Sequence, residues 1–369
     1  MYRFLRTLLF LLPPERAHAL GMGLLALLGR WPWLCRTLRR RALTLPARAP
    51  PVDLTIRTAG LTLAHPLALA AGLDKDGHAV AGLFALGFAA VEVGTVTPRP
   101  QAGNPRPRLY RLPEHGALIN RLGFNNAGAE AAAARLRKGP WRPGPLGVNV
   151  GKNRDTLLEA AADDYLACTA ALAPLADYLV VNASSPNTPG LRQLQEPERL
   201  AALLRAVRAR LGAVAPGTPL LLKIAPDLGE EAVDAVVDVA LDAGADGLIA
   251  TNTSVTRPFA HPLARQEGGL SGRPLRALAA STLRRASRRA DGRLALWGAG
   301  GVATAEDVYK RVRAGASVVQ LYTALVFEGP GLVGRLLSGL AELLRRDGFS
   351  RVEDAVGADA GRRRAAGGG

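Results

Sequence analysis

The chain has 369 residues, of which 48% are hydrophobic and only 5% aromatic, so its core must be built mainly from Leu, Val and Ala. The formal net charge of +16 suits nucleic acid, an anionic membrane face or an acidic substrate as a partner. Cys35 and Cys168 belong to no Cys-x-x-Cys motif or Cys/His cluster. Neither a disulfide framework nor a metal site is therefore expected.

Residues 1–41 form a basic, apolar segment with eight Arg and one Glu. The longest uncharged run, Ala17 to Gly29, is shorter than the ~18 residues that a membrane-spanning helix needs. Pro13 and Pro14 divide the segment into two short helices, which Trp31, Trp33 and a basic run at 36–41 follow. We expect a two-helix extension, separate from the remainder of the chain.

Three interpretations of this extension are open. Ala17-His18-Ala19 resembles the cleavage site of a secretory signal, but the prolines and charges just before it argue against that. The helices could also form a plain cap on the following domain. The favoured interpretation places them in a membrane interface, with apolar faces in the lipid and arginines near anionic headgroups.

Beyond residue 50, short apolar runs alternate with helical stretches. The runs are continuous rather than alternating, as in parallel strands buried on both faces. Eight such units predict an α/β fold, a (β/α)₈ TIM barrel over residues 42–349, with a doubly wound sheet as the alternative. No G-x-G-x-x-G motif supports a dinucleotide-binding sheet. The predicted strands are 67–71, 90–94, 146–150, 178–181, 220–224, 247–250, 294–297 and 317–321.

Other parts of the chain complete this prediction. Helices are expected near 78–86, 126–138, 155–172, 196–212, 229–243, 274–288, 304–314 and 330–346. Two hairpins are expected, one over 53–63 and one over 108–120. Residues 350–369 are rich in Ala, Gly and Arg and are expected to form a disordered tail.

The polar residues at the strand ends predict the site, because the C-terminal strand ends of a barrel carry its active site. Amides are frequent there, and several around one cavity suit a flat ring with alternating carbonyl and N–H groups. Lys223 lies in an apolar strand and requires an anionic partner. The Gly-rich turn at 298–301 and the turn after 321 are places where barrels bind phosphate. Histidine and paired carboxylates do not occur at these positions, so triad and hydrolytic chemistry are disfavoured.

Six motifs occur in order: LAAGLDKDG (69–77), EVGTVTPRP (92–100), NRLGFNN (120–126), NASSPNT (182–188), KIAPD (223–227) and GGLSGRP (268–274). Together they closely resemble the quinone-dependent, class 2 dihydroorotate dehydrogenases over roughly residues 1 to 345. The resemblance implies a flavoprotein oxidoreductase of de novo pyrimidine (UMP) biosynthesis. It would oxidise (S)-dihydroorotate to orotate, with hydride transfer to FMN and reoxidation by a membrane quinone.

The resemblance also implies roles for individual residues. Ser185 would be the catalytic base, and related soluble class 1 enzymes have Cys there and lack the N-terminal extension. FMN would be held by Ala71, Gly72, Leu73, Asp74, Lys75, Thr95, Asn149, Asn182, Lys223, Thr251, Gly272, Gly301, Tyr322 and Thr323. The substrate would be held by Lys75, Asn120, Arg121, Leu122, Gly123, Phe124, Asn182, Asn187, Asn252 and Thr253.

The extension would then form a tunnel from the bilayer to the flavin, with His18, Arg111 and Tyr322 at its polar end. The resemblance implies a peripheral protein on the cytoplasmic face of the inner membrane, a monomer, with no nucleic-acid partner. A dihydrouridine synthase, which modifies RNA, would explain the basic charge but needs a Cys acid near the flavin and an RNA-binding domain. A basic binding barrel without catalysis would not need the amides at the strand ends.

Overall fold

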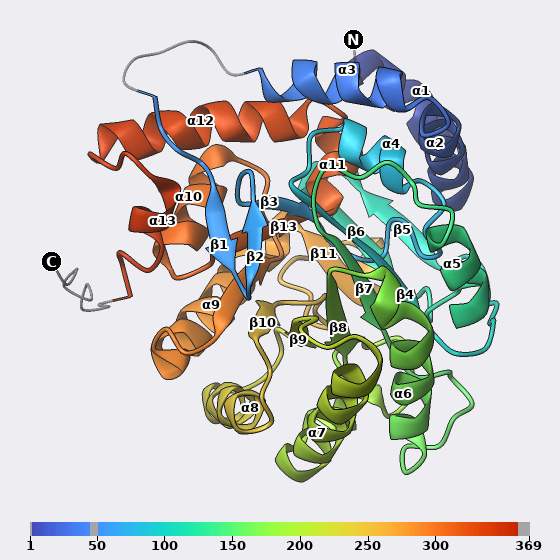
Figure 1. Ribbon diagram of the computed structural model, residues 1–369. Coiled ribbons are helices and arrows are strands. Elements are labelled where there is room, and N and C mark those ends of the chain that lie inside the picture. The colour runs from blue at the N-terminus through green and yellow to red at the C-terminus, as the bar shows by residue number, and fades with distance from the viewer. Residues whose placement is uncertain (1, 45–50, 361–369) are drawn as a thin grey trace, which may run out of the picture.

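The computed structural model describes residues 2–44 and 51–360, and its centre is a closed barrel of eight parallel strands (Figure 1). Around the barrel the order is β3, β4, β7, β8, β9, β10, β12 and β13, so each strand pairs with the next one along the chain and the last pairs with the first. The predicted barrel is confirmed. The strands are β3 (Leu67–Leu69), β4 (Ala90–Val96), β7 (Leu146–Val150), β8 (Tyr178–Asn182), β9 (Leu220–Ile224), β10 (Gly247–Ala250), β12 (Ala295–Ala299) and β13 (Val318–Leu321).

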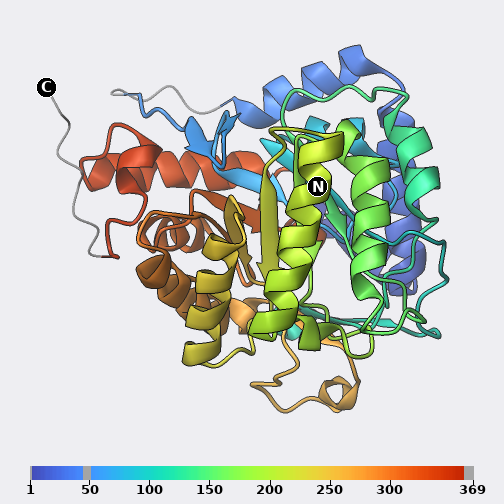
Figure 2. The ribbon, with the colours of Figure 1, turned by 60° about the horizontal axis from the view of Figure 1, so that its bottom comes forward.

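Helices surround the barrel because nearly every strand residue is buried, so both faces of the sheet need an apolar cover. Figure 2 shows α6, α7 and α8 side by side along one flank. The helices of the barrel are α4 (Val80–Ala85), α5 (Ala129–Leu136), α6 (Ala161–Leu172), α7 (Pro197–Val214), α8 (Glu230–Asp242), α9 (Arg276–Ala290), α10 (Ala305–Arg313), α11 (Thr323–Glu328) and α12 (Leu332–Arg346).

A hairpin of β1 (Ile56–Thr58) and β2 (Leu61–Leu63) closes the N-terminal end of the barrel. The Thr58 hydroxyl lies 2.7 Å from that of Ser317 and accepts a hydrogen bond of 3.0 Å from the Trp297 indole. Trp297 is fully buried against Tyr178 inside the barrel. These side chains fill the interior of the barrel at this end.

A small antiparallel sheet lies at the opposite, C-terminal end. It joins β5 (Leu109–Leu112) and β6 (Ala117–Asn120), the predicted second hairpin, to β11 (Gly269–Gly272). The sequence pattern did not predict β11, because its Gly-rich run has no apolar periodicity and pairs only with a distant strand. The loop between β10 and β11 projects beyond this end (Figure 2).

The N-terminal extension contains three helices rather than the predicted two: α1 (Tyr2–Leu11), α2 (Pro14–Leu28) and α3 (Pro32–Leu43). The prolines separate α1 from α2 as expected. The basic run belongs to α3, which packs on α4 and α12. Arg39 is buried there and donates to the carbonyls of Phe84 and Phe88 at 3.0 and 2.6 Å. For α3, whose basic run was predicted only to follow the two helices, the contacts are those of a cap on the barrel.

Residues just beyond 350, which were predicted to belong to a disordered tail, pack against the barrel. The backbone carbonyl of Asp53 accepts a hydrogen bond from the Val352 N–H. Val352 and Ala355 of α13 (Val352–Ala355) are completely buried. Arg313 then binds Asp359. The prediction was wrong for 350–360, because two small apolar residues in a Gly- and Ala-rich stretch give little signal by themselves. Residues 361–369 lie outside the described part.

Candidate active site

A cavity opens at the C-terminal ends of the barrel strands. Strand ends, the small sheet and the turns after β12 and β13 all contribute to its wall, as the barrel architecture requires. Most of the predicted site residues line it: Ala71, Gly72, Lys75, Thr95, Asn120, Leu122, Gly123, Phe124, Asn182, Ser185, Asn187, Lys223, Thr251, Asn252, Thr253, Gly272, Gly301, Tyr322 and Thr323.

The floor of the cavity is a hydrogen-bonded row of amides and hydroxyls. The Asn182 amide donates to the Thr95 hydroxyl at 2.9 Å, and that hydroxyl donates to Asn149 at 2.5 Å. Asn149 in turn donates to the Glu92 carboxylate at 2.8 Å. Asn149 is the fully buried member of this row and does not line the cavity. It therefore supports Thr95 and Asn182 from below.

Lys223 has the anionic neighbour that its sequence context requires. Its ammonium lies 3.8 Å from the Glu92 carboxylate and 3.4 Å from the Gln320 side-chain oxygen. Glu92 is completely buried on β4, and Gln320 interrupts the apolar β13. Both residues were missed by the sequence analysis, although each is a polar residue in an apolar strand, the same signal that identified Lys223.

The turns after β11 and β12 form a cradle in which side chains have no room. A Cβ on Gly301 would lie 2.4 Å from backbone atoms of Arg276, and one on Gly272 would lie 2.3 Å from the Gly116 carbonyl. Both glycines have positive φ, at 76° and 96°. Thr323 closes the cradle with a 2.8 Å hydrogen bond to Ser271. Such a backbone-lined turn next to a helix start is suited to a phosphate group.

Lys75 supplies a cation in a second part of the wall. Its ammonium donates to the Gly72 carbonyl at 2.9 Å, and burial lowers its pKa to about 8, partly opposed by Asp76. Neighbouring Asp74 is turned away, because its carboxylate accepts from the backbone of His78 and Ala79 at 2.9 and 2.7 Å. Lys75 is thus available for an anionic ligand, whereas Asp74 fixes the loop.

Three amide side chains from separate elements line one part of the cavity. Asn187 donates to Asn120 at 3.0 Å, and Asn120 donates to the Gly269 carbonyl at 3.3 Å. Asn252 donates to the Ser184 hydroxyl at 3.0 Å. These side chains come from the β8 loop, β6 and the β10 loop, so only the closed barrel brings them together.

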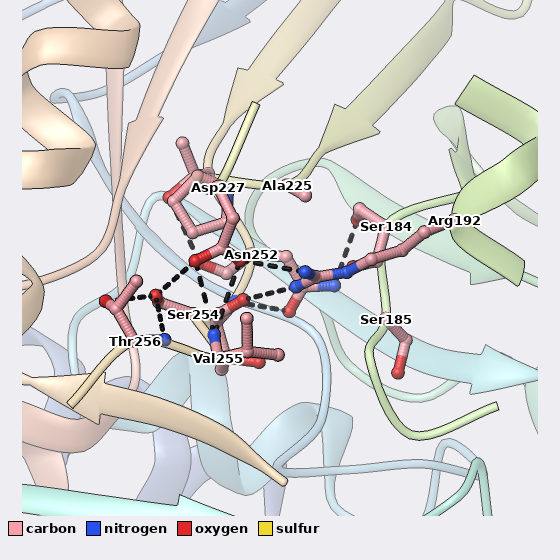
Figure 3. Close-up of polar contacts among 12 residues, drawn as sticks. Ser184, Ser185, Arg192, Ala225, Asp227, Asn252, Ser254, Val255 and Thr256 are labelled. Carbon is pink, nitrogen blue, oxygen red and sulfur yellow. Dashed lines mark hydrogen bonds and ion pairs between the residues drawn. The ribbon is translucent and has the colours of Figure 1, made fainter. Parts of the chain in front are cut away.

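Ser185 and Ser184 have different surroundings. Ser184 is held within the wall, donating to Asn182 at 2.9 Å. Ser185 lines the cavity, and its hydroxyl accepts only a 3.3 Å hydrogen bond from the Asn187 backbone among the described residues. Figure 3 shows the Ser185 hydroxyl apart from the surrounding polar network. Of the two serines, Ser185 is the one that can reach a bound molecule.

An arginine that the sequence analysis missed organises this region (Figure 3). Arg192, in a short 3-10 helix after the Ser185 loop, donates to the carbonyls of Ser184 and Thr253, each at 3.1 Å. Its guanidinium also pairs with Asp227 at 2.9 Å. Arg192 therefore ties the β8 loop to the β10 loop. No short-range pattern marks it, because its partners are far away in the chain.

Several predicted residues lie outside this cavity. Leu73 and Asp74 line a neighbouring cavity, and the Arg121 guanidinium points away to the Pro107 carbonyl, at 2.9–3.0 Å. Arg111 donates to the carbonyls of Leu9 in α1 and of Leu12 just after it, and it is not among the residues that line the neighbouring cavity. The Arg111 guanidinium lies at the C-terminal end of α1 because the free carbonyls there attract a cation.

The neighbouring cavity lies between α2 and the barrel mouth. His18, Ala19, Met22 and Ala26 of α2 line it, and Tyr322 lines both cavities. Burial lowers the pKa of His18 to about 4, so its imidazole is neutral at pH 7. The other lining residues shared with the main cavity are Gly72, Lys75 and Leu122. A ligand between α2 and the barrel would therefore be next to the main cavity.

A closed (β/α)₈ barrel with a cavity of amides, hydroxyls and glycine turns at the C-terminal strand ends has the architecture of a barrel enzyme. The dihydroorotate dehydrogenase family model matches residues 53–344. A dihydroorotate dehydrogenase (quinone) of Myxococcus xanthus is 64% identical over 97% of this chain and 98% of its own. That of Anaeromyxobacter sp. (strain Fw109-5) is 58% identical over 96% of each. The chain belongs to the quinone-dependent dihydroorotate dehydrogenase family.

A solved structure agrees with this assignment. The crystal structure of the Eimeria tenella enzyme in complex with ferulenol superposes with a TM-score of 0.83 at 38% identity. The match covers 94% of this chain and 95% of that one.

Proposed function

We propose that this enzyme oxidises (S)-dihydroorotate to orotate in UMP biosynthesis, holds FMN as its flavin, and passes the electrons to a membrane quinone. The observation that carries the proposal is the convergence of Asn120, Asn187 and Asn252 beside Ser185 in one cavity. Amides offer both a donor and an acceptor, which a dihydropyrimidine ring with carbonyl and N–H groups needs.

FMN fits the residues present. Gly272 and Gly301 line the cavity without side chains, which would let a phosphate group approach the backbone closely. Thr95, Asn182 and Lys223 would face the flavin ring, and Lys223 would stabilise negative charge on its reduced form. When bound, FMN supplies the acceptor for the hydride that leaves C6 of the substrate.

The chain's own residues would bind and orient the substrate. The Lys75 ammonium would pair with the substrate carboxylate. Gly123 and Phe124, in the segment after β6, line the cavity and would cover the ring of dihydroorotate. Holding the ring in one orientation lowers the entropic part of the barrier.

Ser185 would take the proton from C5 of dihydroorotate. A hydroxyl is a weak base, so it needs a route that carries the proton onward. The buried Thr188 hydroxyl has no hydrogen-bond partner among the described residues, and it lies three positions along the same loop. We propose that Thr188 belongs to this relay.

The cavity beneath α2 would admit the quinone. None of the described helices is long and apolar enough to cross a bilayer. The extension nevertheless exposes Phe4, Leu11, Leu24 and Trp33, at 72%, 79%, 59% and 64% of their surfaces. An amphipathic surface of this kind suits a peripheral position in the lipid interface. We propose a monomer on the cytoplasmic face of the inner membrane, with no nucleic-acid partner.

The alternative function, an RNA-modifying flavin reductase, requires a cysteine near the flavin. Cys35 and Cys168 are both buried, and neither lines the cavity. Anaerobic stopped-flow mixing with dihydroorotate tests the choice directly. Bleaching of the flavin absorbance within the turnover time supports the proposal, and an unbleached flavin contradicts it. Decylubiquinone, but not fumarate, should then reoxidise the enzyme.

A further inference from the structure

An ion pair joins the N-terminal extension to the loop that precedes β5. Glu15, in the first turn of α2, accepts from Arg108 at 3.0 Å and from Arg106 at 2.9 Å. The Arg108 side chain is only 6% exposed, whereas Arg106 is 75% exposed. The buried half of the pair is therefore the one in which the charges interact most strongly.

Arg108 has many hydrogen bonds but only one anionic partner. Its guanidinium donates to the carbonyls of Ala102 and Asn104, at 2.5 and 3.1 Å. Among the described residues, Glu15 is the only carboxylate within ion-pair distance. Removing one partner of a buried pair leaves an uncompensated charge, which is strongly unfavourable. The position of Arg108 thus depends on α2.

The loop held by Arg108 supports the wall of the main cavity. Asn104 donates through its backbone to the Leu122 carbonyl at 3.1 Å. Its side-chain amide donates to the carbonyls of Arg121 and Asn187, at 2.9 and 3.2 Å. Leu122 and Asn187 line the main cavity. A continuous set of contacts therefore runs from Glu15 through Arg108 and Asn104 to the cavity wall.

We infer that Glu15 is a positioning residue for substrate binding, which gives the N-terminal extension a role beyond lipid and quinone access. The inference rests on the proposed function, since it takes dihydroorotate as the ligand of the main cavity. Without the carboxylate, Arg108 loses its charge partner and the 102–104 loop loses its fixed position. The wall at Leu122 and Asn187 then binds substrate less well, while Ser185 and the flavin cradle stay in place.

The test compares Glu15→Gln, which keeps the shape and removes the charge, with Glu15→Asp. Flavin-loaded enzyme is mixed anaerobically with dihydroorotate over a range of concentrations. The apparent Kd for dihydroorotate should rise about tenfold in Glu15→Gln, and a tenfold rise corresponds to ~1.4 kcal/mol of binding free energy. In Glu15→Asp, which keeps the charge, the Kd should return at least partly to the wild-type value. The limiting rate of flavin reduction should stay within about twofold of wild type, because only uniform binding is lost.

Two controls separate this role from general damage. Glu230→Gln removes an exposed carboxylate of α8 that pairs with Arg285 of α9 and lines neither cavity, and it should not change the Kd. In a double-mutant cycle, the effects of Glu15→Gln and Arg108→Gln on the Kd should be markedly non-additive. An unchanged Kd in Glu15→Gln, or additive effects, would overturn the inference. Failure of wild-type flavin to bleach would instead overturn the proposed function.

Discussion

Arg192 and Asp227 form an ion pair, with 2.9 Å between Nη1 and Oδ2, at the point where the Ser185 loop meets the loop after β10. The same guanidinium binds the carbonyls of Ser184 and Thr253, so its planar fork uses three partners at once. Lysine cannot reproduce this geometry with a single ammonium. The pair therefore sets the distance between the proposed base and the substrate amides.

We expect Arg192→Lys to lower the limiting rate of flavin reduction by roughly 10- to 100-fold, because a misplacement of about 1 Å can cost that much. Flavin content should remain normal, since Arg192 does not line the cavity. Stopped-flow absorbance measures the rate, and Arg205→Lys on the exposed surface of α7 is the matched control. A rate equal to that of wild type would show that the loops are fixed without Arg192.

Ser185→Ala should leave flavin binding intact and slow flavin reduction by dihydroorotate by about 10²- to 10⁴-fold, the usual contribution of a general base. Ser184→Ala removes the neighbouring hydroxyl, which is held in the wall by Asn182 and Asn252. It should cause a smaller loss. If the two variants were equally slow, or Ser185→Ala were near normal, Ser185 would not be the base.

Substrate affinity should depend on pH through Lys75, whose pKa in the ligand-free enzyme is lowered to about 8 by burial. Below pH 8 the ammonium is charged and binds the carboxylate. Above pH 8 it is neutral, so the Kd for dihydroorotate should rise by up to about tenfold per pH unit. Titrations at pH 6.5 to 9.5 measure this. In Lys75→Gln, binding should be weaker throughout and this pH dependence should disappear; its persistence would assign it to another group.

His65 should make the fold sensitive to acid. Its ring accepts from the Leu67 backbone at 3.3 Å and contacts the Gly87 carbonyl at 2.9 Å, so the buried imidazole is neutral. Burial lowers its pKa from 6.5 to about 4. The unfolded chain therefore binds the proton first, and stability is lost as the pH falls from 6.5 towards 4.

The loss from His65 between pH 7 and pH 5 should be roughly 2 kcal/mol. Urea unfolding of wild type and His65→Gln at both pH values measures it. The His65→Gln variant should have a lower free energy of unfolding than wild type at pH 7. Its free energy of unfolding should fall less than that of wild type between pH 7 and pH 5. An equal loss in both proteins would mean that other groups, such as His18, account for the acid sensitivity.

Membrane binding should depend on exposed apolar side chains of the extension. Leu11→Asp with Trp33→Asp places two charges on residues that are 79% and 64% exposed. Binding to anionic vesicles should fall at least tenfold, because each charge opposes insertion into the interface. Flavin reduction in solution should not change. Leu157→Asp, at a 72% exposed leucine on the barrel, is the control and should bind vesicles normally.

The sequence by itself determined the barrel and most of the cavity lining. Continuous apolar runs of five or so residues permit only strands buried on both faces, and the polar residues that end them must meet at one end. Asn182, Lys223 and Asn252 could be found for this reason. The break at Pro13 and Pro14 was equally local, since proline cannot continue a helix.

The tertiary structure alone decided which of these residues point into the cavity and which support it. Asn149 and Glu92 are on strands but lie under the cavity floor. Arg39 and Arg192 resemble surface arginines in the sequence, yet each binds backbone carbonyls of distant segments. Such contacts have no short-range pattern, because their free energy depends on burial and on partners that only the folded chain brings within hydrogen-bonding distance.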